Sequence, residues 1–217
     1  MRSILILLKK DITLDKANMW IVILVSIGLP IYISYILKDM GLSMGGDFLA
    51  LLLNSFYCIF LAFSKLGMIE HKYKGTAYLT LTPITRKQIV LSKYVLSVFL
   101  FLVSIAGCGV ANLFMAVTAP LTYGSIIIAW AINALVFGIY IPLEFKVGYE
   151  NVKYYLMAIV LASPFLMGFL GKHTGFGFFQ TFAQTGNSLL PFILIMSLAI
   201  YVLSYGISVR IFSRKDL

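Results

Sequence analysis

The sequence predicts an all-α integral membrane protein with six transmembrane helices, an N-terminal interfacial amphipathic helix and both termini in the cytoplasm. Three observations lead to this prediction. The chain is 61% hydrophobic and 12% charged, with a mean hydropathy of +0.98, whereas soluble domains are about 25% charged. Several uncharged segments are long enough to cross a bilayer, and Lys and Arg are distributed unevenly between the connecting segments. A chain of 217 residues has too little interior to hide so many apolar side chains, so a soluble fold is excluded.

The first helix is expected at residues 2–16, lying in the membrane interface before any span. One face would contact the acyl chains and the other the lipid head groups. The apolar residues are Ile4, Leu5, Leu8 and Ile12, and the basic residues are Arg2, Lys9, Lys10 and Lys16. A signal peptide is not expected, because the apolar core is too short and no small-residue cleavage site follows.

Six segments are predicted to cross the membrane, since a span needs about 20 apolar residues. They are residues 17–37, 48–69, 94–118, 124–143, 154–171 and 189–209. The uncharged stretch 94–143 supplies two of them, because Pro120 and Gly124 mark a turn in its middle. No internal repeat or low-complexity linker divides the chain, so we expect a single transmembrane domain over residues 1–217.

The positive charges place both termini in the cytoplasm. In this topology all of the 17 Lys and Arg residues except Lys38 and Lys172 lie on one face of the membrane, and cytoplasmic segments carry such an excess. The pI near 9.5 is then explained by attraction to anionic membrane lipid rather than by nucleic acid. The expected location is the plasma membrane of a bacterium, as a multi-pass protein.

The sequence offers little sign of a catalytic or cofactor site. It contains no GxxxxGK phosphate loop and no HExxH, and its GxSxG match, at residues 41–45, lies between the first two predicted spans. His71 and His173 fall on opposite faces of the membrane, and Cys58 and Cys108 are interpreted as small apolar residues. No Asp or Glu lies within a predicted span, which argues against a proton-driven transporter. We therefore expect no enzyme and no cofactor or metal bound by this chain.

The connection 70–93 carries two structural signals. Thr85 and Gln88 fit a capping box, which predicts a helix that starts near Arg86 and runs into the third span. Residues 75–81 form a short, mostly apolar helix candidate that Pro83 ends. An apolar helix outside the membrane favours a protein partner, and a helical hairpin resting on the head groups is the alternative.

Two motifs carry a resemblance to a known family. They are LTPITRKQIVLSKY at residues 81–94 and IPLEFKVGYENVKY at residues 141–154, with a weaker third, RIFSRKDL, at residues 210–217. The chain resembles the type-2 permeases of ABC transporters, specifically the small six-span group that includes the phenol-soluble-modulin exporter permeases. It departs from the group's pattern at Thr82 and Glu144, without a change in spacing.

The resemblance implies the transmembrane subunit of an exporter, powered by a separate ATPase subunit that binds ATP and Mg²⁺. It also implies a dimer, with a second copy or a related permease, and a hydrophobic or amphipathic substrate, with a peptide preferred. The residues it assigns to ATPase coupling are Glu70, Gly75, Thr76, Tyr78, Leu79, Leu81, Pro83, Arg86, Lys146, Gly148, Tyr149 and Glu150. They lie in two cytoplasmic coupling loops, 70–93 and 144–153. For Arg86, anchoring to lipid phosphate is an equal alternative to a salt bridge with the partner.

Polar and small residues within the spans admit two interpretations. Asn54, Asn112 and Asn133 are candidates for the substrate path, because a buried amide in hydrocarbon needs a partner or water, and hydrogen bonding between helices is the alternative. Gly107 and Gly109 are expected to allow close helix approach rather than to bind substrate.

Two questions stay open at this level. The external stretch 171–188 is rich in Gly and Phe, and it is either a re-entrant or interfacial segment at the extracellular exit or a set of aromatic residues resting in the interface. The second hypothesis for the whole chain is a non-transporting membrane protein, an immunity or scaffold protein that binds a toxin or partner through the same loops.

Overall fold

The computed structural model describes residues 2–14, 16–39, 46–73, 84–114, 121–173 and 189–214. Within these ranges the regular structure is entirely α-helical. The helices are α1 (Arg2–Leu14), α2 (Lys16–Asp39), α3 (Gly46–Lys72), α5 (Arg86–Phe114), α6 (Tyr123–Val147), α7 (Tyr149–His173) and α9 (Leu190–Ser213). The prediction of an all-α protein is thereby confirmed for the described part of the chain.

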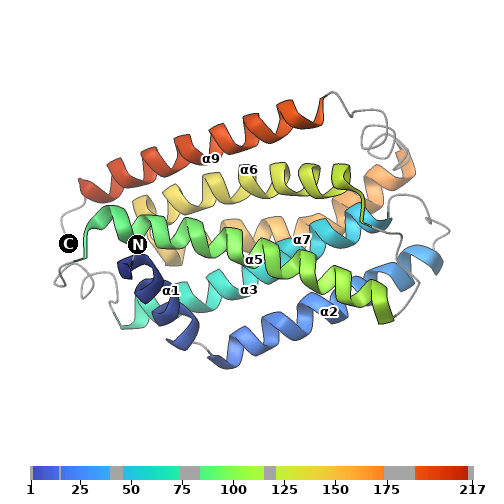
Figure 1. The fold of residues 1–217 in the computed structure, drawn as a ribbon, viewed down its shortest axis with the longest axis horizontal. Coiled ribbons are helices and arrows are strands. Elements are labelled where there is room, and N and C mark those ends of the chain that lie inside the picture. The colour runs from blue at the N-terminus through green and yellow to red at the C-terminus, as the bar shows by residue number, and fades with distance from the viewer. Residues whose placement is uncertain are drawn as a thin grey trace.

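The long helices lie along the long axis of the molecule and alternate in direction, while the shorter α1 lies at one end of the bundle (Figure 1). At this end α3, α6 and α9 finish, and α5 and α7 begin. We call it the α1 end, and the opposite end, where α2, α5 and α7 finish, the far end. The first described helix, α1, and the C-terminal end of the last one, α9, therefore lie at the same end of the bundle.

Five of these helices are long and apolar enough to cross a membrane. The candidate spans are Lys16–Ile36, Phe48–Lys72, Arg86–Leu113, Tyr123–Val147 and Leu190–Ser213. The predicted span 154–171 falls on α7, part of whose side chains lie outside the described residues, and it stays a prediction. The predicted break between the third and fourth spans lies between the end of α5 and Tyr123, where α6 begins.

The capping box at the start of α5 is confirmed. The backbone N–H of Gln88 donates to Thr85 Oγ1 at 3.4 Å, and the backbone N–H of Thr85 donates to Gln88 Oε1 at 3.1 Å. These bonds satisfy donors that a helix start otherwise leaves unpaired. The helix begins at Arg86, eight residues before the span predicted at 94, so its first turns lie beyond that span.

The predicted coupling loop 144–153 is helical in the structure apart from Gly148, and its role in coupling stays a prediction. Helix α6 continues to Val147, and α7 begins at Tyr149. Gly148 has a φ of 92°, which other residues rarely adopt, and its N–H closes the end of α6 on the Glu144 carbonyl at 3.0 Å. A single glycine is therefore sufficient to turn the chain from one helix into the next.

Helix α1 packs against the bundle, which corrects part of its predicted orientation. Leu7 is buried, Leu8 packs against the core, and Lys10 forms ion pairs inside the protein. The prediction had placed Leu8 toward the acyl chains and Lys10 toward the head groups. It treated the helix as isolated on the membrane, whereas neighbouring helices cover this face. Ile6 and Lys9 remain exposed.

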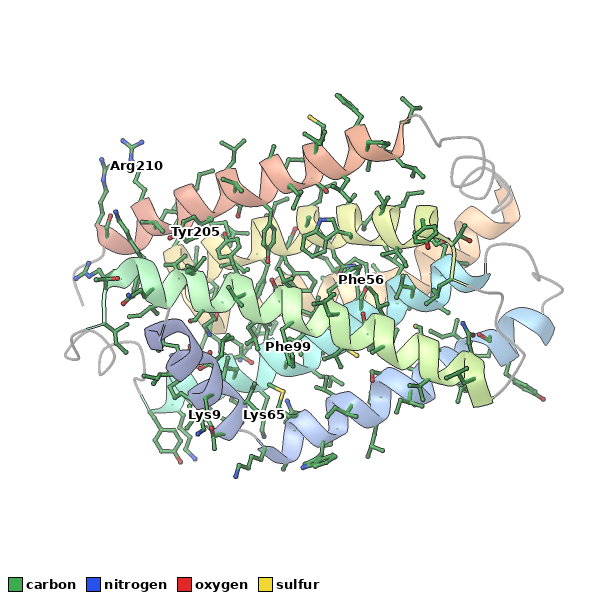
Figure 2. All side chains as sticks on the ribbon, in the orientation of Figure 1. Lys9, Phe56, Lys65, Phe99, Tyr205 and Arg210 are labelled. Carbon is green, nitrogen blue, oxygen red and sulfur yellow. The ribbon has the colours of Figure 1, made fainter. Side chains whose placement is uncertain are left out.

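The core lies between α3, α5 and α6, and aromatic rings fill much of it. Phe63 meets Tyr140 edge-on at 6.0 Å between ring centroids, and Phe56 lies 6.1 Å from Phe137. The side chains of α2 and α9 point outward to a large extent (Figure 2). Exposed residues such as Trp20 on α2 form the apolar outer surface that a protein presents to lipid.

Candidate functional site

Five charged residues from four helices meet at the α1 end. Lys93 Nζ of α5 lies 2.8 Å from Glu70 Oε2 of α3 and 3.9 Å from Glu144 Oε1 of α6. Lys10 Nζ of α1 lies 3.4 Å from Glu70 Oε1 and 2.9 Å from Asp11 Oδ1. We call Lys10, Asp11, Glu70, Lys93 and Glu144 the charged cluster. It joins segments that are far apart in the sequence.

The charged cluster is largely buried. The exposed fraction is 3% for Lys93, 9% for Glu70 and 1% for Asp11. A buried charge is tolerated only when it is paired and hydrogen-bonded, so the two carboxylates around Lys93 hold α3, α5 and α6 in a fixed arrangement. Burial raises the pKa of the Asp11 carboxyl above its ordinary value, and the ammonium groups of Lys93 and Lys10 partly offset this shift.

Sequence reasoning did not find this cluster. It places Lys93 among the cytoplasmic charges and in the motif at residues 81–94, and it finds no Asp or Glu within a predicted span. Glu70 and Glu144 each follow a predicted span by one residue, but the candidate spans of the structure continue past them to Lys72 and Val147. The sequence does contain a signal for this cluster. Charged residues on different predicted helices lie at similar distances from the end of the bundle that these helices share.

Tyr149, the first residue of α7, packs against α3 and is half-buried. Its hydroxyl donates to the Ser64 carbonyl at 2.7 Å. Its ring occupies the space beside Gly67, where a Cβ atom would come within 2.3 Å of the ring. The resemblance assigned Tyr149 to ATPase coupling, and its observed contacts connect the α6–α7 corner to α3.

Tyr149→Phe is expected to lower the free energy of unfolding by about 0.5–1.5 kcal/mol, the usual value of one hydrogen bond, because the ring stays and only the bond to Ser64 is lost. Chemical denaturation of the detergent-solubilised protein measures this difference. The control is Tyr154→Phe on the same helix, where the side chain is exposed and the expected change is within about 0.5 kcal/mol. Equal effects of the two substitutions would contradict the role of the Tyr149 hydroxyl.

Arg86 connects the beginning of α5 to the end of α9. Its Nη1 donates to the carbonyl oxygens of Phe212 at 3.0 Å and Ser213 at 2.9 Å. A cation at a helix C-terminus pairs with carbonyls that have no helical donor and with the negative end of the helix dipole. The structure thus gives Arg86 an internal role beside the two alternatives considered from the sequence, a lipid phosphate and a partner salt bridge.

Exposed residues surround the charged cluster at the surface of the α1 end. His71 Nδ1 lies 3.8 Å from Glu150 Oε1, and both side chains are more than half exposed. Lys146 and Tyr73 are also exposed. This surface includes Lys146 and Glu150, two of the residues assigned to ATPase coupling, and it lies where α3 ends and α7 begins.

The centre of the predicted main coupling segment lies outside the described residues. This applies to Gly75, Thr76, Tyr78, Leu79, Leu81 and Pro83, whose assignment stays a prediction. The residues on either side are described. Tyr73 follows the end of α3, and Thr85 precedes α5, so the connection leaves and re-enters the bundle at the α1 end.

The three asparagines assigned to a substrate path differ in their surroundings. Asn54 is buried and donates to the carbonyls of Ser26 and Ser104, both at 3.1 Å. Asn133 is buried and donates to Ser55 Oγ and to the Ala129 carbonyl, both at 2.8 Å. These are contacts within and between helices. Asn112, near the far end of α5, is partly exposed, and its Oδ1 has no hydrogen-bond donor within the described part of the chain.

The charged cluster links helices mechanically at the α1 end. Among the residues that the structure describes, no group of His, Cys, Asp and Glu has the arrangement of a metal site. The charged cluster instead joins the ends of four helices next to an exposed surface. A force on that surface would therefore act on α1, α3, α5 and α6 together.

Comparison with known proteins adds one match. The family model described as ABC-2 family transporter protein matches residues 6–213, which is nearly the whole chain. No curated protein and no solved structure matches the chain. The family match therefore covers every described helix from the middle of α1 to the end of α9.

Proposed function

Since this chain belongs to the ABC-2 family of transporter proteins and is thus a permease of an ABC transporter, we propose that it couples ATP hydrolysis on a separate ATPase subunit to substrate export. The observation that carries the proposal is the α1 end, where the charged cluster lies directly beside an exposed surface. Glu70 of the cluster lies one helical turn before Tyr73, from which the predicted coupling segment continues.

The ATPase would bind at the α1 end, on the cytoplasmic side of the membrane. The helix ends at this side carry most of the Lys and Arg residues, in agreement with a cytoplasmic location. Lys9, Lys65 and Arg210 all lie toward this end of the bundle (Figure 2), where they would contact anionic lipid head groups of the plasma membrane. In this arrangement six helices cross the membrane, with α7 as the fifth span.

ATP and Mg²⁺ would bind to the partner ATPase. Closure of the ATPase pair around ATP would displace residues 74–83 and the neighbouring α6–α7 corner. Because Lys93 is paired with both Glu70 and Glu144, the displacement would reach α3, α5 and α6 together. In this mechanism Glu70 positions helices rather than touching the ATPase, since it is buried.

The proposed substrate is an amphipathic peptide that enters from the cytoplasm or the inner leaflet. The spans offer apolar and aromatic surface with few charges away from the α1 end, and the motifs resemble those of phenol-soluble-modulin exporters. The export path would form between this permease and a second copy, or a related permease. Exposed apolar side chains on α2 and α9 are available for either a permease partner or lipid.

Co-purification tests the proposal. The tagged protein would be expressed with the products of its chromosomal neighbours, extracted in mild detergent and analysed by mass spectrometry. We expect a soluble ATPase in stoichiometric amount, and we expect Tyr78→Ala or Leu79→Asp in the predicted coupling segment to remove it. The ATPase activity of the wild-type complex should rise with amphipathic peptides.

The matched control is Tyr123→Ala, which removes an exposed tyrosine at the far end. It should retain the ATPase. If the folded wild-type protein retains no ATPase, the proposal fails and the immunity or scaffold hypothesis takes its place. If the ATPase is retained by Tyr78→Ala and Leu79→Asp as well, the ATPase binds elsewhere on the permease.

A further inference from the structure

Two prolines whose side chains the structure describes lie in the interior of long helices. These are Pro30 in α2 and Pro142 in α6. Proline has no backbone N–H, so the carbonyl four residues earlier loses the donor that a regular helix provides. The carbonyls concerned belong to Ser26 and Gly138. In hydrocarbon, where water cannot replace the missing donor, a neighbouring group of the protein must do so.

In both helices a side chain from a neighbouring helix donates to this carbonyl. Asn54 Nδ2 of α3 donates to the Ser26 carbonyl at 3.1 Å, and Ser204 Oγ of α9 donates to the Gly138 carbonyl. Both donors are buried. The same substitution of a side-chain donor for a backbone donor therefore occurs at two separate sites.

Each of the two donors has a second partner. Asn54 uses the other hydrogen of its amide on the Ser104 carbonyl of α5, at 3.1 Å. An amide carries two such hydrogens, and the two carbonyl oxygens at 3.1 Å are closer partners than Cys108 Sγ, which lies 3.5 Å from the same nitrogen. Ser204 Oγ lies 2.6 Å from the Tyr94 hydroxyl, which can donate to it while Ser204 donates to Gly138.

Close helix approach makes the first site possible. A Cβ atom on Gly107 of α5 would lie 2.3 Å from the Ser26 carbonyl oxygen, so the absence of a side chain there lets α5 come next to the carbonyl that Pro30 leaves free. At the second site the carbonyl itself belongs to a glycine, and a Cβ on Gly138 would lie 3.7 Å from Ser204 Cβ.

We propose that these two pairs, Pro30 with Asn54 and Pro142 with Ser204, are clasped hinges, positions at which α2 and α6 bend and at which the side-chain bond holds one bend. A side-chain bond to another helix can be released without unwinding the helix that contains the proline. Pro142 lies two residues before Glu144 of the charged cluster, so a displacement of the cluster reaches this hinge directly. The role of the hinges in transport rests on the proposed function.

Double-mutant cycles test the clasps. Asn54→Leu leaves the Ser26 carbonyl without its donor, whereas Pro30→Ala restores a backbone donor to the same carbonyl. We therefore expect Asn54→Leu to change the unfolding equilibrium constant by roughly three- to twentyfold in the wild-type background, as for other hydrogen bonds between membrane helices. The change should be smaller in the Pro30→Ala background. Ser204→Ala and Pro142→Ala should behave in the same way, and Ser204→Thr, which keeps a hydroxyl, should lose less than Ser204→Ala.

The controls are the crossed pairs, Asn54→Leu with Pro142→Ala and Ser204→Ala with Pro30→Ala, which should be additive because they share no partner. If the effects of the matched substitutions on unfolding add as fully as those of the crossed pairs, the side chains do not replace the missing backbone donors. That result would overturn this part of the proposal. The hinge is tested separately by hydrogen exchange in residues 22–34 and 134–146, where each proline-to-alanine change should slow exchange in its own helix. Unchanged exchange in both helices would overturn the hinges.

Both measurements use the purified chain alone. Failure to find an ATPase would therefore count against the proposed function without affecting the clasps. Conversely, additive cycles would overturn the clasps and leave the assignment of the ATPase site to be decided by co-purification.

Discussion

Replacing Lys93 with methionine is expected to lower the free energy of unfolding by about 3–5 kcal/mol, the usual cost of removing one partner from a buried ion pair. Lys93 is 3% exposed and lies 2.8 Å from Glu70 and 3.9 Å from Glu144. Without it, α3 and α6 would each present a buried carboxylate with no cation from α5 between them. Denaturant titration of the detergent-solubilised protein measures the loss.

Lys87→Met is the matched control, because Lys87 lies on the same helix but is exposed. The expected change there is within about 0.5 kcal/mol. The double variant Glu70→Leu with Lys93→Met should recover part of the loss, since apolar residues of similar size often replace a buried ion pair without penalty, while Glu144 still lacks its cation. Similar stabilities for Lys93→Met and Lys87→Met would show that the charged cluster does not hold the helix ends together.

Gly107→Ala is expected to destabilise the protein by about 1–3 kcal/mol, the usual cost of overpacking a tight interior. The new Cβ would lie 2.3 Å from the Ser26 carbonyl oxygen. Because the obstruction is backbone rather than a side chain that could rotate away, α2 and α5 must separate. This separation would also lengthen the contacts of Asn54, which bonds to both helices.

Gly109→Ala, two residues further along α5, provides a control of opposite sign. A Cβ at Gly109 meets nothing within 4 Å, and alanine is favoured over glycine in a helix by about 1 kcal/mol. We therefore expect Gly109→Ala to leave the unfolding transition unchanged or to raise it. If Gly107→Ala changes the unfolding transition no more than Gly109→Ala does, the result contradicts the close contact between α2 and α5.

Features that depend on neighbouring residues along the chain were predictable from the sequence. The apolar segments gave five helices that can cross a membrane, and the capping box of Thr85 and Gln88 gave the start of α5. Both are local, because a hydrophobic run and a helix start are determined within a few turns of chain. The family followed from motifs of fixed spacing in the sequence, and the match over residues 6–213 confirms it.

Features that depend on distant residues were not predictable. The pairing of Lys93 with Glu70 and Glu144 requires knowing which helices are adjacent at the α1 end and which sides face one another. The sequence alone does not distinguish Lys10, which turns inward, from Lys9, which stays exposed, because both lie in the same basic run. The positive φ of Gly148, at which α6 passes into α7, becomes visible only in the structure.

The structure places the residues assigned to ATPase coupling in different surroundings, and the assignment itself stays a prediction. Lys146 and Glu150 lie on the exposed surface that the resemblance suggested, whereas Glu70 is buried and Arg86 bonds to the end of α9. An assignment carried by a motif identifies positions in the sequence. It does not distinguish a side chain that contacts a partner from one that holds the contacting surface in place.

Site-specific photo-crosslinking tests the central claim, that an ATPase subunit binds at the α1 end, most directly. Tyr73 and Tyr123 form a matched pair, because they lie at opposite ends of the bundle and are 63% and 86% exposed. Each would be replaced by a photoreactive phenylalanine in cells that also express the chromosomal neighbours. The account predicts a crosslinked ATPase from position 73 and none from position 123, and an ATPase crosslinked from position 123 alone, or from neither position, would contradict it.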